Sequence, residues 1–120
     1  DGLSQAPLII PMIEHIDAIE DIEDILSVEV DAVMIGPYDL SSSLGITGEF
    51  DNPKYKNALN KFISQCSKNN ISTGYHIVGS EHTKEPYTEL QERILEGYRF
   101  IVYSGDINFI NKHCKNPYSR

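Results

Sequence analysis

Four short apolar runs, separated by stretches with helical spacing, constrain this chain more than any other feature of its sequence. The runs cover residues 7–14 (PLIIPMIE), 30–36 (VDAVMIG), 71–78 (ISTGYHIV) and 99–103 (RFIVY). The first has the length and the aliphatic content typical of a strand buried on both faces. Strands that alternate with helices pair in parallel through right-handed crossovers. The sequence therefore predicts an α/β fold with four parallel strands.

The first connection between strands has the pattern of an amphipathic helix. Asp17 is a candidate N-cap, and Glu20 stands three residues later, as in a capping box. Apolar residues then recur at near-helical spacing, at Ile16, Ile19, Ile22 and Leu26. The acidic residues between them predict a solvated face with no other role.

Proline, glycine and capping residues predict where the later loops and helices begin and end. We expect a polar loop after Gly36, running to Gly48. Asn52 followed by Pro53 predicts the start of a second helix, in which Cys66 falls on the apolar stripe as a buried thiol. Pro86 opens a third helix and Gly97 is placed to end it. Asp106 is expected to cap a short terminal helix.

Composition excludes several classes of function. Eighteen acids against ten bases give a net charge of -8, which argues against nucleic-acid binding. No apolar run approaches the roughly 20 residues of a membrane span, and no secretory leader pattern is present. Cys66 and Cys114 are too few for a disulfide scaffold and fit a reducing, cytoplasmic location. Because the first residue is Asp1 and not an initiator methionine, we expect either that a segment has been removed or that the chain is part of a longer one.

The predicted strand ends carry the candidate functional residues. Ligands in parallel α/β folds bind beyond the carboxyl ends of the strands. Two carboxylates, Glu14 and Asp39, stand at the ends of what should be neighbouring strands. Hard divalent cations take such oxygen ligands together with water and substrate oxygens. Acids at strand ends also cap helices or pair with basic side chains, so spacing alone leaves these interpretations open.

The order of residues in one long segment distinguishes between these interpretations of Glu14 and Asp39. Residues 12–45 (MIEHIDAIEDIEDILSVEVDAVMIGPYDLSSSLG) contain an apolar strand ending in Glu, a helix, a VDAVMIGP strand, a DLS turn and a following LG. This segment resembles the HpcH/HpaI aldolase family, metal-dependent aldolases of 2-keto-3-deoxy sugar acids and related 4-hydroxy-2-oxo acids. The match continues through Asp51-Asn52-Pro53, Gly74 and residues 97–106.

The resemblance implies a metal-dependent retro-aldol cleavage that releases pyruvate and an aldehyde. Glu14 and Asp39 would hold a divalent ion, Mg²⁺ or Mn²⁺ or else Co²⁺, which chelates the 2-oxo acid and neutralises the pyruvate enolate. Backbone N–H groups of Tyr38 and Asp39 would donate to the substrate carboxylate. Gly36 and Pro37 would shape that turn.

Three positions depart from the family's pattern or stay open. Met12 stands where relatives often carry a Gln that orients substrate. His76 replaces a usually apolar residue, and it either faces the aldehyde half of the substrate or is a polar rim residue. His15 lies beside a candidate ligand but on the opposite strand face, so it is not expected to bind the metal.

The resemblance also implies that this chain is incomplete as an enzyme. A (β/α)₈ TIM barrel takes about 250 residues, and residues 1–120 match only its C-terminal half, strands five to eight. In the family the general-base His and a substrate-binding Arg come from the first half. We therefore expect no catalytic residue here, an isolated chain that is inactive, and two open sheet edges. Family members are commonly hexameric, which implies a homo-oligomer for the full-length protein.

Two alternatives to the aldolase remain. One is an acyl-CoA lyase of the same superfamily, of the citryl- or malyl-CoA type, although the GPYDLS turn favours the aldolase branch. The other is a non-catalytic half barrel that either assembles with a partner or is only a folded remnant.

Overall fold

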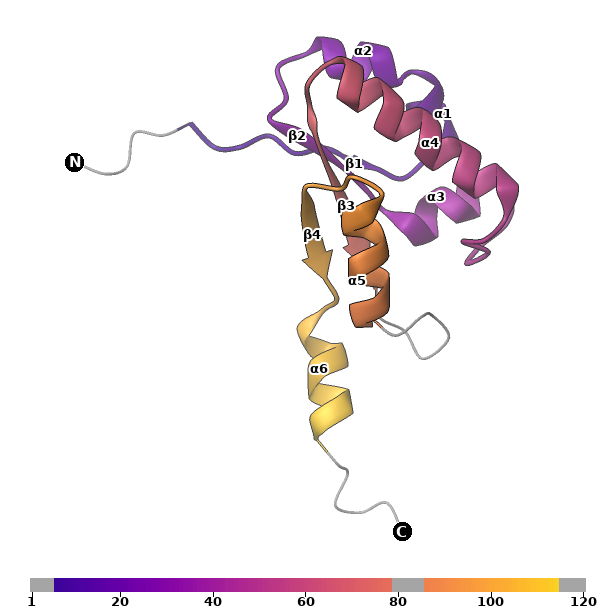
Figure 1. Ribbon diagram of the computed structural model, residues 1–120, viewed down its shortest axis with the longest axis vertical. Helices are drawn as coiled ribbons and strands as arrows, with labels where there is room; N and C mark the ends of the chain where they lie inside the picture. The colour runs from indigo at the N-terminus through magenta and orange to yellow at the C-terminus, as the bar shows by residue number, and fades with distance from the viewer. Residues whose placement is uncertain (1–5, 79–85, 115–120) are drawn as a thin grey trace, which may run out of the picture.

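The computed structural model describes residues 6–78 and 86–114, which form one parallel sheet with helices packed against it (Figure 1). The described residues contain four strands: β1 (Met12–Ile13), β2 (Ala32–Ile35), β3 (Ser72–Ile77) and β4 (Phe100–Tyr103). The helices between and after them are α1 (Ile16–Glu20), α2 (Ile22–Ser27), α3 (Pro37–Ser43), α4 (Pro53–Lys68), α5 (Pro86–Leu95) and α6 (Asp106–His113). The strand order is β1-β2-β3-β4 and every pair is parallel. The predicted fold class is confirmed.

The register aligns one row of residues across all four strands. Met12 pairs with Met34, Met34 with Gly74, and Gly74 with Phe100. Gly74 carries no side chain because a Cβ atom there would overlap the Phe100 ring. This glycine is therefore required by the contact across β3 and β4.

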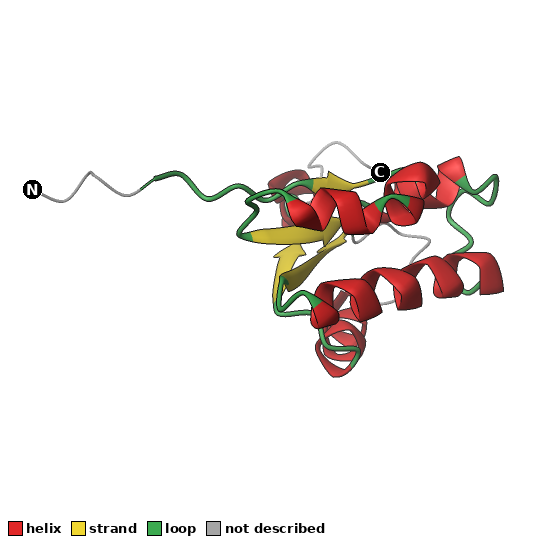
Figure 2. Ribbon diagram, turned by 90° about the horizontal axis from the view of Figure 1, so that it is seen from above, coloured by secondary structure: helices red, strands yellow, loops and turns green. Residues whose placement is uncertain are grey.

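The first strand is much shorter than predicted. Only Met12–Ile13 form β1, and the N-terminal arm before it extends from the packed body (Figure 2). The carbonyl oxygens of Ile9 and Pro11 still accept hydrogen bonds from the Asp31 and Met34 N–H groups, each at 3.0 Å, so residues 9–11 follow the edge of the sheet without forming a regular strand. Prolines at positions 7 and 11 have no N–H to donate to a ladder. Leu8 is 72% exposed, so the expectation of burial on both faces is wrong for this segment.

The first predicted helix is divided in two and begins with a different cap. Asp21 interrupts the helix between α1 and α2. His15, rather than Asp17, is the N-cap of α1, and its Nδ1 accepts a hydrogen bond from the Asp17 N–H at 3.2 Å. The apolar spacing was nevertheless informative, because Ile19 and Ile22 are both buried.

The predicted loop after Gly36 begins with a helix, α3, and only residues 44–48 after it form turns. Gly36 is its N-cap and Pro37 its first residue, where the fixed φ angle of proline suits a helix start. The start of α4 is as predicted, since Asn52 caps it by accepting a hydrogen bond from the Lys54 N–H at 3.0 Å. In both places a capping residue is followed by proline, which is the pattern of a helix start.

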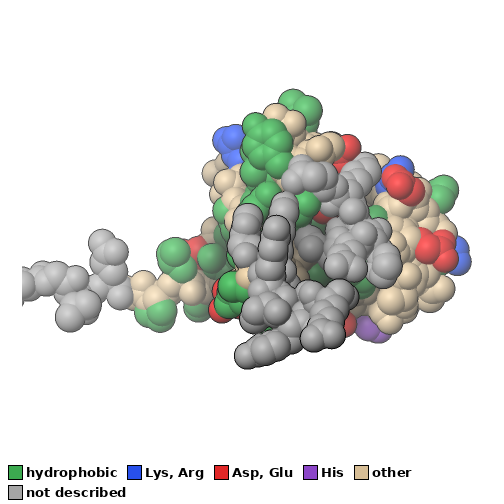
Figure 3. Space-filling model, turned by 90° about the horizontal axis from the view of Figure 1, so that it is seen from below, with side chains coloured by type: hydrophobic (Ala, Val, Ile, Leu, Met, Phe, Trp, Pro, Cys, Tyr) green, Lys and Arg blue, Asp and Glu red, His purple; other side chains and the backbone are tan. Residues whose placement is uncertain are grey.

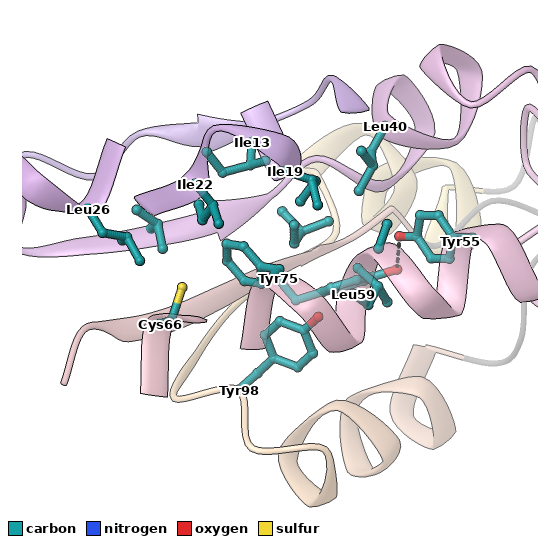
Figure 4. Close-up of a cluster of buried hydrophobic side chains, with 14 of the residues drawn as sticks. Ile13, Ile19, Ile22, Leu26, Leu40, Tyr55, Leu59, Cys66, Tyr75 and Tyr98 are labelled. Carbon is teal, nitrogen blue, oxygen red and sulfur yellow. Dashed lines mark hydrogen bonds between the residues drawn. The ribbon is translucent and has the colours of Figure 1, made fainter. Parts of the chain in front are cut away.

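A hydrophobic core joins the helices to the sheet (Figure 4). Ile13, Leu40 and Tyr75 enter it from β1, α3 and β3 and are at most 2% exposed. Cys66 of α4 is fully buried, as predicted, and burial raises the pKa of its thiol to about 11. The sheet and α1 to α4 therefore form the part of the molecule that can hold a site rigidly.

The C-terminal elements extend beyond this core. Gly97 ends α5 with φ of +101°, as predicted. The N-cap of α6 is Gly105 instead of Asp106, whose Oδ1 accepts a hydrogen bond from the Ile107 N–H at 2.8 Å. Among the described helices none has the length and hydropathy needed to cross a membrane.

Candidate functional site

Glu14, Gly36 and His76 lie in one row at the carboxyl ends of the first three strands. Glu14 lies two residues after Met12, Gly36 two after Met34, and His76 two after Gly74; these three earlier residues form a row paired across the strands. Because side chains alternate between the faces of a sheet with a period of two, they share the face of that row. The Gly36 N–H donates to the Ile13 carbonyl oxygen at 3.0 Å. The hydrogen bonding between β1 and β2 therefore extends to the carboxyl ends of these strands.

The Glu14 side chain packs directly over Gly36. A Cβ atom at Gly36 would lie 2.7 Å from both Cγ and Oε1 of Glu14 and 3.1 Å from its Cδ. These separations are shorter than non-bonded contacts, so the Glu14 carboxylate occupies the space that any larger residue at position 36 would need. The carboxylate is thus brought to the end of β2.

Asp39 belongs to the same stretch of structure. It lies in the first turn of α3, three residues after the Gly36 N-cap. A carboxylate in this position is stabilised by the helix dipole. Glu14 therefore packs on the N-cap of the helix whose first turn contains Asp39.

Glu14 and Asp39 offer carboxylate oxygens, the donor type that hard divalent cations take. Both are exposed, and neither has a hydrogen-bond or ion-pair partner within residues 6–78 and 86–114. That same part of the chain contains no group of three or more His, Cys, Asp or Glu side chains that could hold a metal. Mg²⁺ suits such a sparse donor set, because it retains several waters and takes one or two carboxylates plus substrate oxygens.

The other sequence candidates fall into two groups. Pro37 and Tyr38 are the first residues of α3, directly after Gly36, against which the Glu14 side chain packs. His76 is half-buried on β3, in the row that contains Glu14 and Gly36. His15 lies apart from this row as the exposed cap of α1, with Nδ1 3.3 Å from Asp17 Oδ2.

Two serines of α3, within the stretch predicted to be a loop, connect α3 to neighbouring segments by hydrogen bonds. The Ser43 hydroxyl accepts a hydrogen bond from the Ile16 N–H at 3.0 Å and donates to the Leu40 carbonyl at 2.8 Å. It thereby ties the start of α1, just after Glu14, to α3. Ser41 is fully buried and accepts a hydrogen bond from the Gly48 N–H at 3.0 Å. The proline after Gly36 was the signal that could have identified the helix carrying both.

A groove of about 810 Å³ lies elsewhere, between α4 and α5. Its charged side chains are largely engaged with one another: Lys56 lies 2.9 Å from Asp51, and Arg93 lies 2.6 Å from Glu96. None of Glu14, Gly36, Asp39 and His76 lines this groove. We therefore assign the candidate site to the strand ends, where parallel α/β proteins bind their ligands.

Fold and site together define a parallel α/β chain with candidate oxygen ligands at the carboxyl ends of its strands. More specifically, the chain belongs to the HpcH/HpaI aldolase/citrate lyase family, whose model matches residues 4–96.

Curated relatives are similar over different portions of the chain. It is 31% identical over 108 residues to a 4-hydroxy-4-methyl-2-oxoglutarate aldolase of Hapsidospora irregularis, covering 88% of this chain and 38% of that protein. A 4-hydroxy-2-oxo-heptane-1,7-dioate aldolase of Escherichia coli is 32% identical over 83 residues, covering 68% of this chain and 31% of that protein.

Solved structures agree with the fold. An HpcH/HpaI aldolase of Desulfitobacterium hafniense superposes with a TM-score of 0.76 and 30% identity, over 88% of this chain and 39% of the other. A family protein of Burkholderia cenocepacia gives a TM-score of 0.77 at 22% identity, over 88% and 38% respectively, and supports the fold alone. The chain thus spans less than half the length of these relatives, as a partial barrel does.

Proposed function

We propose that this chain is the metal-binding half of an aldolase that cleaves a 4-hydroxy-2-oxo acid to pyruvate and an aldehyde. The observation that carries the proposal is the packing of Glu14 over Gly36, at the start of the helix that contains Asp39. Family membership supports it, and so do the two relatives above, whose names describe aldolases of 4-hydroxy-2-oxo acids.

Each candidate residue has a separate task in this proposal. Glu14 and Asp39 would hold Mg²⁺ or Mn²⁺, with Co²⁺ as a further candidate. A bound divalent cation supplies Lewis acidity toward the keto and carboxylate oxygens of a 2-oxo acid. First-turn N–H groups of α3, from Tyr38 and Asp39, would donate to the substrate carboxylate. His76 would face the aldehyde half.

The four strands would take places five to eight of the barrel. The chain matches 38% of one curated aldolase and 31% of another, so the proposed activity belongs to the complete protein. The complementary strands would supply the general base and close the sheet. Residues of this chain would bind and orient the 2-oxo acid.

Thermal unfolding with and without metal tests the proposal. Mn²⁺ and pyruvate should raise the Tm of the chain, because a ligand that binds only the folded state stabilises it. At about ten times Kd the gain is about 1.4 kcal/mol, or roughly 5 °C for a chain of this size. Asp39→Asn and Glu14→Gln should each abolish the rise.

Glu29→Gln is the matched control. Glu29 is exposed and precedes β2, at the opposite end of the sheet, so this variant removes one negative charge without touching the site. It should keep the full rise in Tm. A wild-type chain whose Tm does not respond to Mn²⁺ and pyruvate would instead favour a non-catalytic half barrel.

A further inference from the structure

We propose that Gly36 is a positioning residue, which orients the Glu14 carboxylate toward Asp39 by leaving its own side-chain space empty. This inference rests on the proposed metal site. It concerns a residue that itself contributes no ligand atom. The structural basis is the contact described above, in which Glu14 Cγ and Oε1 lie where a Cβ atom of residue 36 would be.

Backbone conformation does not explain a glycine at this position. Gly36 has φ of -96° and ψ of 98°, a region open to every L-residue. Gly45 and Gly48 differ, because their φ angles of +72° and +76° favour glycine for conformational reasons. Of the atoms near the missing side chain of Gly36, the three nearest all belong to Glu14.

A methyl group at position 36 would therefore move one side chain. The overlapping atoms belong to the end of a flexible, exposed Glu side chain and not to the backbone. The carboxylate can swing away into solvent while β1, β2 and α3 keep their places. Metal affinity should fall because the two carboxylates no longer converge on one ion.

Gly36→Ala tests this in a Mn²⁺ titration followed by the EPR signal of the free ion. We expect the affinity to fall roughly 10- to 100-fold, as when a residue that orients a metal ligand is changed. Gly105→Ala is the matched control, because Gly105 also follows a strand, at φ of -120°, and a Cβ there would meet nothing within 4 Å. Its affinity should match that of the wild type.

A Glu14→Ala background shows whether Gly36 acts through Glu14. There, adding Gly36→Ala should change neither the residual Mn²⁺ affinity nor the Tm. If Gly36→Ala alone failed to fold but the double variant folded, overlap with the Glu14 side chain would be the cause, and the inference would stand. Failure of both variants to fold would overturn it. Equal Mn²⁺ affinity in the wild type and in Gly36→Ala would also overturn it. A wild type that binds no Mn²⁺ would refute the proposed metal site, and this role with it.

Discussion

Three buried tyrosines connect the sheet to the helices at the residue scale. The Tyr55 and Tyr75 hydroxyls share a hydrogen bond of 3.1 Å, drawn as a dashed line in Figure 4. The Tyr98 hydroxyl is buried and has no hydrogen-bond partner among the described residues. Burial raises the pKa of all three phenols, that of Tyr75 to about 12 even though Arg93 lies over its ring.

These phenols predict a loss of stability in alkaline solution. Their folded-state pKa values lie above the unfolded value near 10, so their contribution is complete below about pH 10. It is lost as the pH rises toward the folded values, because the unfolded chain releases these protons first. Each phenol then costs about 1.4 kcal/mol per pH unit. Urea unfolding measured from pH 8 to 11 should show this decline.

Tyr98→Phe is the control for that measurement. It removes one buried phenol whose hydroxyl has no partner, and the stability at pH 8 should rise by about 1 kcal/mol because an unsatisfied polar group is gone. The alkaline decline should become shallower. An equally steep loss of stability in Tyr98→Phe would mean that the Tyr98 phenol does not contribute to it.

At the scale of elements, Ser43 joins α3 to the segment that carries Glu14. Ser43→Ala removes the acceptor of the Ile16 N–H and the donor to the Leu40 carbonyl. We expect a loss of about 1–2 kcal/mol in the free energy of unfolding, since a half-buried N–H is left without its partner. Urea denaturation at pH 7 measures it.

Ser27→Ala provides a close comparison. The Ser27 hydroxyl also donates to a carbonyl three residues earlier, that of Asp24, at 2.7 Å, but it is exposed and links no second element. This variant should change stability by less than about 0.5 kcal/mol. Similar losses in the two variants would show that the link between α1 and α3 contributes nothing.

Sequence patterns predicted elements where the signal was local and failed where tertiary contacts decide. Asn52 caps α4 through its own side chain, a pattern visible in two adjacent letters. The short helices α1 and α2 depend on packing more than on propensity, so no local pattern marks the break at Asp21. The helix after Gly36 differs, because Pro37 is a local signal for its start. Strand-end position selects Glu14 and Asp39 only as candidates, and their proposed metal-binding role comes from the family resemblance. The contact of Glu14 with Gly36 depends on the register between β1 and β2, which no local pattern reveals.

At the scale of the whole molecule, the sheet ends in two unpaired edges. Within residues 6–78 and 86–114, β1 pairs only with β2, and β4 only with β3. Apolar side chains are exposed beside both edges: Leu8, Ile9 and Ile10 before β1, Val102 and Tyr103 on β4, and Ile107, Phe109 and Ile110 on α6. Hydrophobic side chains stand at the surface along the N-terminal arm in the space-filling view (Figure 3). Edges of this kind pair with further strands.

The open edges predict that the isolated chain associates with itself at micromolar concentration. Parallel sheets are stable when both faces and edges are covered, and the chain matches 38–39% of its relatives' length, so its own strands cover only part of such a sheet. Val102→Lys and Ile9→Lys place a charge at each edge and should shift the weight-average mass in sedimentation equilibrium toward the monomer. Leu95→Lys, at an 87% exposed position on α5, adds the same charge away from both strands. If association is general hydrophobic clustering, all three variants will weaken it alike; if the edges drive it, Leu95→Lys will associate as the wild type does.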